Sequence, residues 1–172
     1  MYALTVWAPW STLIIEGWKP YEFRRWDYRL RRPDLVGRRI AIHAGARPVK
    51  RREVLDLLDR LGRKQSRVSE AAVPFLEQLH LTPFMVPLAV VLGTAVLGEP
   101  IECRTLFGSG VLTYPDSDRV EHQAWAWPLA DIERFPVPVP ARGFQGFWRW
   151  RVEEGASLPT CANPQTDLVA WR

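Results

Sequence analysis

The residues best placed to do chemistry lie in the segment KPYEFRRW, which begins at Lys19. Lys19 and Glu22 stand three positions apart and could serve as an acid–base pair or as two polar contacts for a ligand. If the segment forms a strand, alternation places Glu22, Arg24 and Trp26 on one face. These three groups could hydrogen-bond a flat heterocycle and stack on it. The alternative is a surface ion pair beside a partly buried tryptophan, worth ~0–1 kcal/mol.

Two groups near this segment are further candidates. Lys19 precedes Pro20, which favours an extended backbone at the lysine. Lys19 could contact a phosphate or act as a base, and a solvated turn lysine is the alternative. Ser11 and Thr12 lie near the start of a short predicted helix, where free backbone N–H groups favour anions, and Trp10 beside them is also a predicted ligand residue. Ser11 could equally cap that helix.

Three more candidates lie later in the chain. His43 falls near the end of a predicted strand, so it could face a cleft, although a lone histidine is more often structural. Arg142 and Gln145 lie in the segment ARGFQG, whose glycines allow close approach of the backbone. Gln145 could read the edge of a nucleobase through paired hydrogen bonds. A tight turn into the last strand is the alternative.

Two pairs of tryptophans each fall on one face of a predicted strand: Trp125 with Trp127, and Trp148 with Trp150. Large indole side chains at alternate positions are typical of core filling. The alternative is a platform on which unpaired bases stack, worth ~1–3 kcal/mol per base.

A basic stretch covers residues 31–52, which hold seven arginines and Lys50 against a single acid, Asp34. Such a stripe predicts a phosphate-binding surface, and a solvated surface is the alternative. The predicted phosphate-binding residues are Arg31, Arg32, Arg38, Arg39, Arg47, Arg51 and Arg52.

Length and composition restrict the class of protein. The chain has 172 residues, of which 47% are hydrophobic and 24% charged, as in a globular domain. Its two cysteines form no CxxC pair or Cys/His cluster, so we expect no metal site and no cofactor. The longest apolar run, residues 84–98, is too short and broken to span a membrane. No signal peptide is recognisable, so a cytoplasmic location is expected, and no oligomeric state is predicted.

Hydrophobic patterns predict a mixture of short strands and helices. We expect strands over residues 3–7, 21–26, 38–45, 86–103, 124–127 and 146–151. The strand over 86–103 should bend at Gly93 or Gly98. Helices are expected from Pro9 to Gly17, over residues 49–64, and from Ser69 to about 80, with a turn of helix after 127. Residues 107–123 should form a loop.

Four segments together resemble the ASCH domain, a branch of the PUA-like superfamily. They are ALTVWAPWSTLIIEGWKPYEFRRW, RRIAIHAG, VVLGTAVLGE and WAWPLADIERFPVPVPARGFQGFW, the last with a proline-rich turn. The likeness covers residues 3–46 and 86–151. It implies an α+β fold: a small PUA-like β-barrel of about six strands, flanked by helices. Residues 1–152 would be one domain with a helical insertion at about 47–83, and residues 153–172 a C-terminal tail.

The same resemblance implies a cleft between the first helix and the barrel, lined by Lys19, Glu22 and Arg24, and binding of RNA or of a single-stranded or modified base. One bacterial subgroup hydrolyses N4-acetylcytidine with a lysine, a threonine three positions later and a distant glutamate. Here Glu22 stands at the threonine position, which argues against that activity. A nucleotide-directed hydrolase, either amidohydrolase or ribonuclease, that uses Lys19 and Glu22 remains the alternative. An adaptor that uses the inserted helices is a third possibility.

Overall fold

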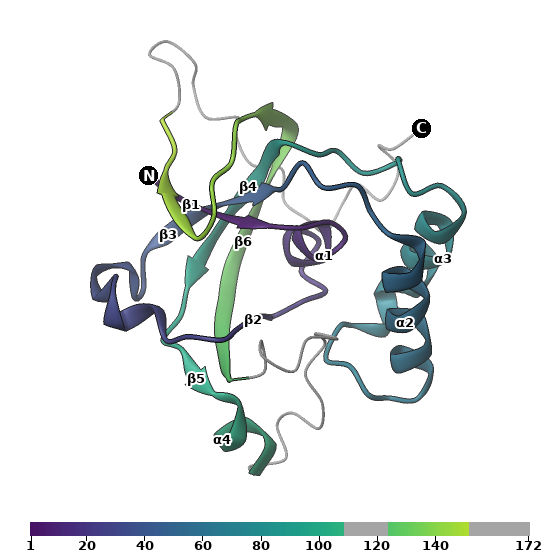
Figure 1. Cartoon of the computed structure of the whole chain (residues 1–172), viewed down its shortest axis with the longest axis horizontal. Coiled ribbons are helices and arrows are strands. Elements are labelled where there is room, and N and C mark those ends of the chain that lie inside the picture. Colours follow the sequence, from purple (N-terminus) through teal and green to yellow (C-terminus); the bar gives the residue numbers. More distant parts are fainter. Residues whose placement is uncertain (109–123, 152–172) are drawn as a thin grey trace.

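One curled sheet carries the fold of this computed structural model, which describes residues 1–108 and 124–151, apart from the Phe107 side chain (Figure 1). The strand order is β2-β6-β4-β3-β1-β7, and β5 pairs with β6. The strands are β1 (Tyr2–Val6), β2 (Tyr21–Arg24), β3 (Arg39–Ala44), β4 (Val90–Leu97), β5 (Ile101–Glu102), β6 (Trp125–Pro140) and β7 (Phe147–Arg149). The prediction of an α+β fold with a barrel-like sheet is confirmed.

Helices flank this sheet. They are α1 (Trp10–Ile15), α2 (Arg51–Gly62), α3 (Val73–Leu81) and α4 (Cys103–Gly108), with short 3₁₀ turns η1 (Tyr28–Leu30), η2 (Pro33–Leu35) and η3 (Glu70–Ala72). None of the described helices has the length and apolar character to cross a membrane. Most of the predicted loop over 107–123 and the predicted tail lie outside the described residues.

Helix α1 is short because its ends are marked by the sequence. Pro9 occupies the N-cap position, and Gly17, two residues after the last helical one, has φ +74°. A left-handed residue just past the last turn ends a helix, and glycine adopts it without steric cost. Ile14 and Ile15 bury their side chains against the concave face of the sheet. The helix therefore fills the hollow of the curled sheet (Figure 1).

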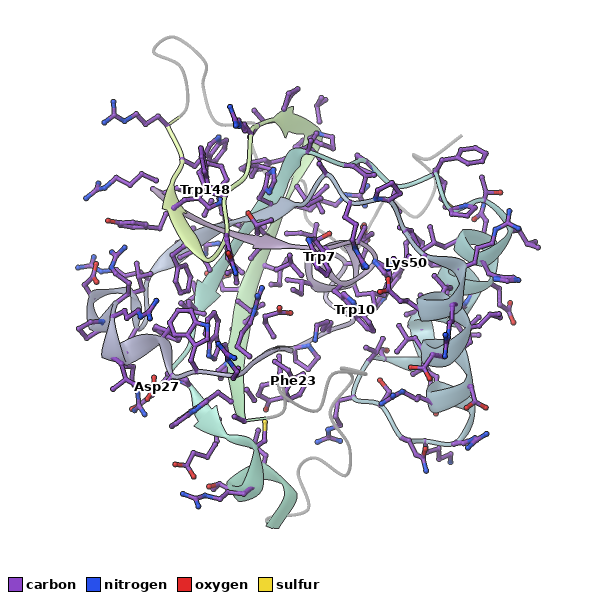
Figure 2. All side chains as sticks on the ribbon, viewed as in Figure 1. Trp7, Trp10, Phe23, Asp27, Lys50 and Trp148 are labelled. Atoms are coloured by element: carbon purple, nitrogen blue, oxygen red, sulfur yellow. The ribbon has the colours of Figure 1, made fainter. Side chains whose placement is uncertain are left out.

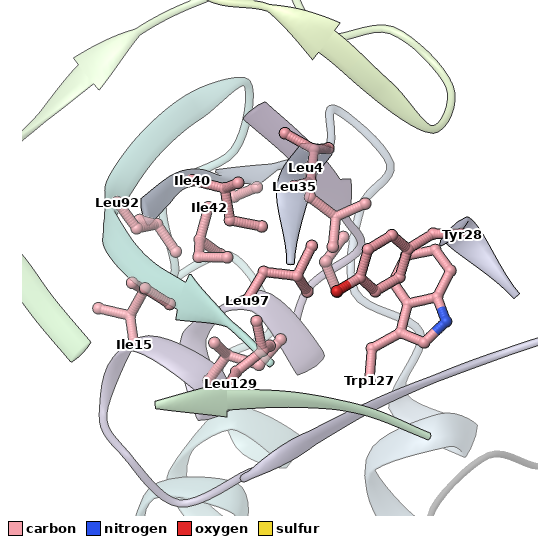
Figure 3. Packing of buried hydrophobic residues seen from close by; sticks show 14 residues of the cluster. Leu4, Ile15, Tyr28, Leu35, Ile40, Ile42, Leu92, Leu97, Trp127 and Leu129 are labelled. Carbon is pink, nitrogen blue, oxygen red and sulfur yellow. The ribbon is translucent and has the colours of Figure 1, made fainter. Parts of the chain in front are cut away.

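The main core lies under this helix (Figure 3). Leu4, Ile42 and Leu97 come from three neighbouring strands, and the Trp127 ring is fully buried among them. Trp127 stacks on Phe147 with 5.4 Å between ring centroids. The core-filling interpretation of Trp127 is therefore confirmed, and this stack connects β6 to the edge strand β7.

The segment after Trp127 departs from the prediction. We expected a turn of helix and then a proline-rich turn, and both were wrong because β6 runs for 16 residues. Its prolines at 136, 138 and 140 alternate, so the missing N–H groups all lie on one edge of the strand. The other edge faces β4, and directly after the strand the Ala141 N–H donates to the Ala89 carbonyl. Two register shifts against β4 let the strand bend with the sheet.

Helices α2 and α3, which were predicted to be an insertion, build most of a second core. Val54, Leu57 and Leu61 of α2 pack with Leu76 and Leu79 of α3. The predicted Ser69 cap is present, because its Oγ accepts a hydrogen bond from the Ala71 N–H. This cap begins η3, and α3 follows it directly. Ala8 and Leu13 join the same cluster, so α2 and α3 pack against the segment that includes the start of α1.

Candidate functional site

A cleft of about 1200 Å³ lies where the ends of β1 and β3 meet the segment after β6. Its walls come from β1 and the start of α1, from β2, from the loop after β3, from α2 and from residues 140–146. Six of the predicted ligand residues line it: Trp10, Glu22, Arg24, His43, Arg142 and Gln145. Residues that are distant in sequence are thus brought to one hollow, with both polar and aromatic groups on its wall.

Glu22 is the buried carboxylate of the cleft. Its Oε1 lies 3.0 Å from Arg24 Nη2, and its Oε2 lies 3.8 Å from Lys19 Nζ. Both Glu22 and Arg24 line the cleft, so the predicted alternation along β2 is confirmed for these two residues. Arg24 Nη2 also donates to the Thr5 carbonyl at 3.1 Å. A carboxylate fixed between two cations can accept hydrogen bonds from N–H donors of a ligand.

Lys19 lies behind Glu22 and does not line the cleft. Its side chain is 4% exposed, and Nζ donates to the Tyr21 carbonyl at 2.5 Å. The ammonium also lies 5.0 Å from the centroid of the Phe23 ring, within the range of a cation–π contact. Lys19 therefore acts on the cleft through Glu22, because protein groups surround its nitrogen.

Besides Lys19, two predicted ligand residues, Ser11 and Trp26, do not line the cleft. Ser11 is fully buried, and its Oγ finds no hydrogen-bond partner within the described part of the chain, so it does not cap α1 either. Trp26 packs edge-on against Trp127 at 5.1 Å, and its carbonyl accepts a hydrogen bond from the Trp127 indole. Strand β2 ends at Arg24, so the alternation does not extend to Trp26.

His43 is held by hydrogen bonds on both ring nitrogens and is 1% exposed. A carbonyl can only accept, so Nε2 carries the proton that it donates to the Ala141 oxygen at 3.0 Å. The Thr5 hydroxyl accepts from the Trp148 indole and lies 3.2 Å from Nδ1, to which it donates. This network fits the neutral imidazole. Burial lowers the pKa of His43, and the hydrogen bond to Ala141 opposes that effect.

The role of His43 is to position one wall of the cleft. Its ring ties β3 to the segment after β6 at Ala141. A Cβ atom added at Gly143 would lie 2.2 Å from the His43 Cε1 atom, so the glycine packs directly on the ring. The geometry therefore fits a structural role for His43. Its contacts hold the segment after β6, which presents Arg142 and Gln145 at the cleft.

Trp7, Arg47 and Glu53 form a further part of the wall. The Arg47 guanidinium lies 4.1 Å from the centroid of the Trp7 ring and makes two hydrogen bonds to Glu53. Arg47 was predicted from the sequence as a phosphate contact, whereas Trp7 and Glu53 were not predicted. The position of Trp7 at the end of the first predicted strand was a usable signal for it. Glu53 gave none, because it resembles any solvated helix residue.

The predicted basic stripe divides into two groups. Arg31, Arg32, Arg38 and Arg39 lie before or at the start of β3, and Arg47, Arg51 and Arg52 lie beyond its end. Strand β3 has six residues, or a length of about 20 Å. Arg32 is paired with Asp34, and Arg39 with Asp131 and Glu133. The seven arginines therefore do not make one continuous surface.

Metal ligands do not gather in this structure. Within residues 1–108 and 124–151, no three His, Cys, Asp or Glu side chains come together as a metal site requires. The wall of the cleft carries hydrogen-bonding groups, side chains of both charges and flat rings.

Comparison with known proteins gives structural likenesses alone. No family model matches the sequence, and no curated protein matches it. Two solved structures of an ASCH protein from Zymomonas mobilis, one of them a point mutant, are similar to this chain at 18% and 17% identity. Each covers 87% of both chains, with TM-scores of 0.49 for the mutant and 0.48 for the other. The chain is thus similar, over most of its length, to structures named for the family that its sequence motifs resemble.

Proposed function

We propose that this chain binds nucleic acid, either RNA or a single strand with a modified base, and holds one nucleobase in the cleft. The observation that carries the proposal is the carboxylate of Glu22, buried and fixed by Arg24, on the wall of a cleft that also presents the Trp10 indole. A fixed acceptor beside a flat ring is what recognition of a single base requires.

The chemistry of the wall favours bases that carry amino groups. Glu22 can accept hydrogen bonds from the exocyclic amine of cytosine or from the N–H edge of guanine. Uracil has a carbonyl oxygen where cytosine has its amine, and its single N–H donor on this edge lies between two carbonyl oxygens, which a carboxylate repels. Trp10 and Phe144 supply rings for stacking, and Gln145 can both donate and accept. We therefore expect cytidine or guanosine to bind more tightly than uridine.

Positive charge at the rim supports a polymeric or phosphorylated ligand. Arg47 and Arg142 line the cleft, and Arg51 and Arg52 are exposed just beyond it. The cleft, at about 1200 Å³, exceeds the ~300–1,000 Å³ typical of pockets for drug-sized ligands. It therefore has room for a base with its sugar and phosphate.

The position of Lys19 favours binding over catalysis. A nucleophile or general base must reach the reacting atom within hydrogen-bond distance. Lys19 lies behind Glu22, and its nitrogen is directed at the Tyr21 carbonyl. Glu22 is thus presented to a ligand, whereas Lys19 supports it from the protein side.

Calorimetric titration of the four ribonucleosides tests this function. The wild-type protein should bind cytidine or guanosine at least about tenfold more tightly than uridine, a difference of ~1.4 kcal/mol. Glu22→Gln replaces one acceptor by an amide donor and should remove that preference. Glu77→Gln changes an exposed glutamate of α3 and serves as the control. Equal binding of all four nucleosides, or a preference that survives Glu22→Gln, would contradict the proposal.

A further inference from the structure

Arg47 and Glu53 form the best-aligned ion pair on the cleft wall. Arg47 Nη1 donates to Glu53 Oε1 at 2.9 Å, and Nη2 donates to Oε2 at 2.6 Å. The two side chains are 19% and 18% exposed. Arg47 lies in the loop after β3, and Glu53 lies in the first turn of α2. Helix α2 therefore contributes a carboxylate to a cleft whose other walls come from the sheet, the start of α1, the loop after β3 and the segment after β6.

The Arg47 guanidinium is held in a fixed plane. One face lies 4.1 Å from the centroid of the Trp7 ring, and this indole is 39% exposed at the cleft. Figure 2 shows Trp7 near Trp10, where β1 passes into α1. Arg47 Nε is buried, and among the residues that the structure describes it has no hydrogen-bond acceptor. The Arg47 guanidinium is thus oriented before any ligand binds, and its Nε remains an unused donor.

The other two cations of the cleft are less suited to bind an anion. Arg24 Nη2 already donates to the Thr5 carbonyl and contacts Glu22, which ties it to the wall. Arg142 is exposed, and its guanidinium lies 5.9 Å from the Phe144 ring centroid. Of these three arginines, only Arg47 combines partial burial with one face stacked on an indole and with donation through both Nη1 and Nη2 to one carboxylate.

We propose that Arg47 is the phosphate subsite of this cleft, and that the Glu53 carboxylate occupies the phosphate position in the free protein. Carboxylate and phosphate oxygens bind the guanidinium fork with the same bidentate geometry, so one can replace the other. A phosphate that enters the cleft displaces Glu53 toward solvent. The inference rests on the proposed function for the identity of the ligand, and on the Arg47 geometry for the site itself.

Glu53 thereby sets which ligands the cleft favours. A nucleoside does not compete with Glu53, whereas a nucleotide must displace it before its phosphate reaches Arg47. Because Glu53 lies in the first turn of α2, the helix dipole also stabilises its charge. The insertion therefore lowers the affinity of the cleft for phosphate groups while leaving base recognition by Glu22 unchanged.

The test compares three probes by calorimetry: inorganic phosphate, cytidine and cytidine 5′-monophosphate. Glu53→Gln keeps a hydrogen-bond acceptor for Arg47 but removes the competing charge. It should tighten binding of inorganic phosphate and of the nucleotide by about tenfold, with cytidine within about twofold of wild type. Arg47→Gln combined with Glu53→Gln should abolish the gain. Asp56→Asn removes a charge from the same helix, where Asp56 pairs with Arg60, and is the matched control.

The outcomes separate this inference from the proposed function. Equal tightening in Glu53→Gln and Asp56→Asn would show a general charge effect and overturn the subsite. A lowered melting temperature of Glu53→Gln without any gain for phosphate would show that the pair only ties α2 to the sheet. Tighter phosphate binding by Glu53→Gln with no nucleoside bound to any variant would support the subsite and contradict the proposed function.

Discussion

The Arg24 guanidinium donates a hydrogen bond to the Thr5 carbonyl at 3.1 Å, and so joins two strands that are not neighbours in the sheet. Strand β2 is one edge of the sheet, and β1 lies next to the opposite edge strand, β7. The same nitrogen holds Glu22 at 3.0 Å. Arg24 thus links the open sides of the curled sheet and fixes the carboxylate that faces the cleft.

Replacement of Arg24 should therefore affect both stability and binding. Arg24→Met keeps much of the side-chain volume but loses the hydrogen bond to Thr5 and the contact with Glu22. We expect a loss of about 1–3 kcal/mol in the free energy of unfolding, together with weaker nucleoside binding. Urea unfolding measures the first effect. Arg104→Met, at an exposed residue paired with Glu102, should change stability by less than about 0.5 kcal/mol. Equal losses in both variants would show that Arg24 is an ordinary surface residue.

The sequence predicted the polar face of β2 but not everything around it. Strand alternation is a local rule, so Glu22 and Arg24 could be placed together without knowledge of the fold. Trp26 lies beyond the end of β2, where burial against Trp127 decides its direction. Glu53 reaches the cleft only because α2 packs beside the loop after β3. Such a long-range placement leaves no local pattern in the sequence.

Strand β6 shows a second limit on what could be predicted from the sequence. Its alternating prolines have the composition of a turn, and the local rules predicted one. The strand forms because the missing N–H groups share one edge, while the other edge faces β4. The pairing continues just past both strands, where the Ala141 N–H donates to the Ala89 carbonyl. The tertiary pairing with β4 therefore outweighs the local signal over these residues.

Loss of Lys19 should destabilise the protein rather than stop a reaction. Lys19→Met removes a buried cation beside Glu22 and its hydrogen bond to the Tyr21 carbonyl. We expect a loss of about 1–3 kcal/mol in stability and no turnover of N4-acetylcytidine by the wild type or the variant. Chromatography of the products measures turnover. Wild-type hydrolysis that Lys19→Met abolishes, with folding intact, would assign a catalytic role to this lysine.

His43 should make the protein less stable in mild acid. Burial lowers its pKa in the folded state below the ordinary value of 6.5, so the unfolded chain binds a proton more readily. The stabilising contribution is present above pH 6.5 and is lost as the pH falls through that value toward the folded pKa. Urea unfolding at about pH 7.5 and pH 5.5 should show a smaller acid-induced loss for His43→Gln than for the wild type. An identical loss in both would contradict the neutral imidazole.

A methyl group at Gly143 should disturb the same wall. The added Cβ would meet the His43 ring at 2.2 Å from Cε1 and 2.5 Å from Nδ1. The ring or the segment after β6 must move, so Gly143→Ala should lower stability by about 1–3 kcal/mol and weaken nucleoside binding. Gly62→Ala is the control, because nothing lies within 4 Å of its added Cβ. Unchanged binding by Gly143→Ala would show that this wall does not contact the ligand.

Binding of single strands should depend on salt, and the two arginine groups should differ. Each phosphate neutralised adds ~0.7 to the log–log salt slope. For a strand of about four nucleotides, a Gln replacement of both Arg51 and Arg52 should reduce the slope measured by fluorescence anisotropy. The same replacement of Arg31 and Arg38, at the far end of β3, should leave it unchanged. Equal reductions, or a flat affinity from about 50 to 200 mM salt, would contradict this account.

A crystal soaked with the nucleoside that binds most tightly tests the central claim most directly. We expect density for the base in the cleft, with an amino group within hydrogen-bond distance of a Glu22 carboxylate oxygen and with the ring beside Trp10. A second cavity of about 470 Å³, lined in part by Lys64 and Arg67, offers a rival position. Density in that cavity, or a base in the cleft that does not contact Glu22, would contradict the account.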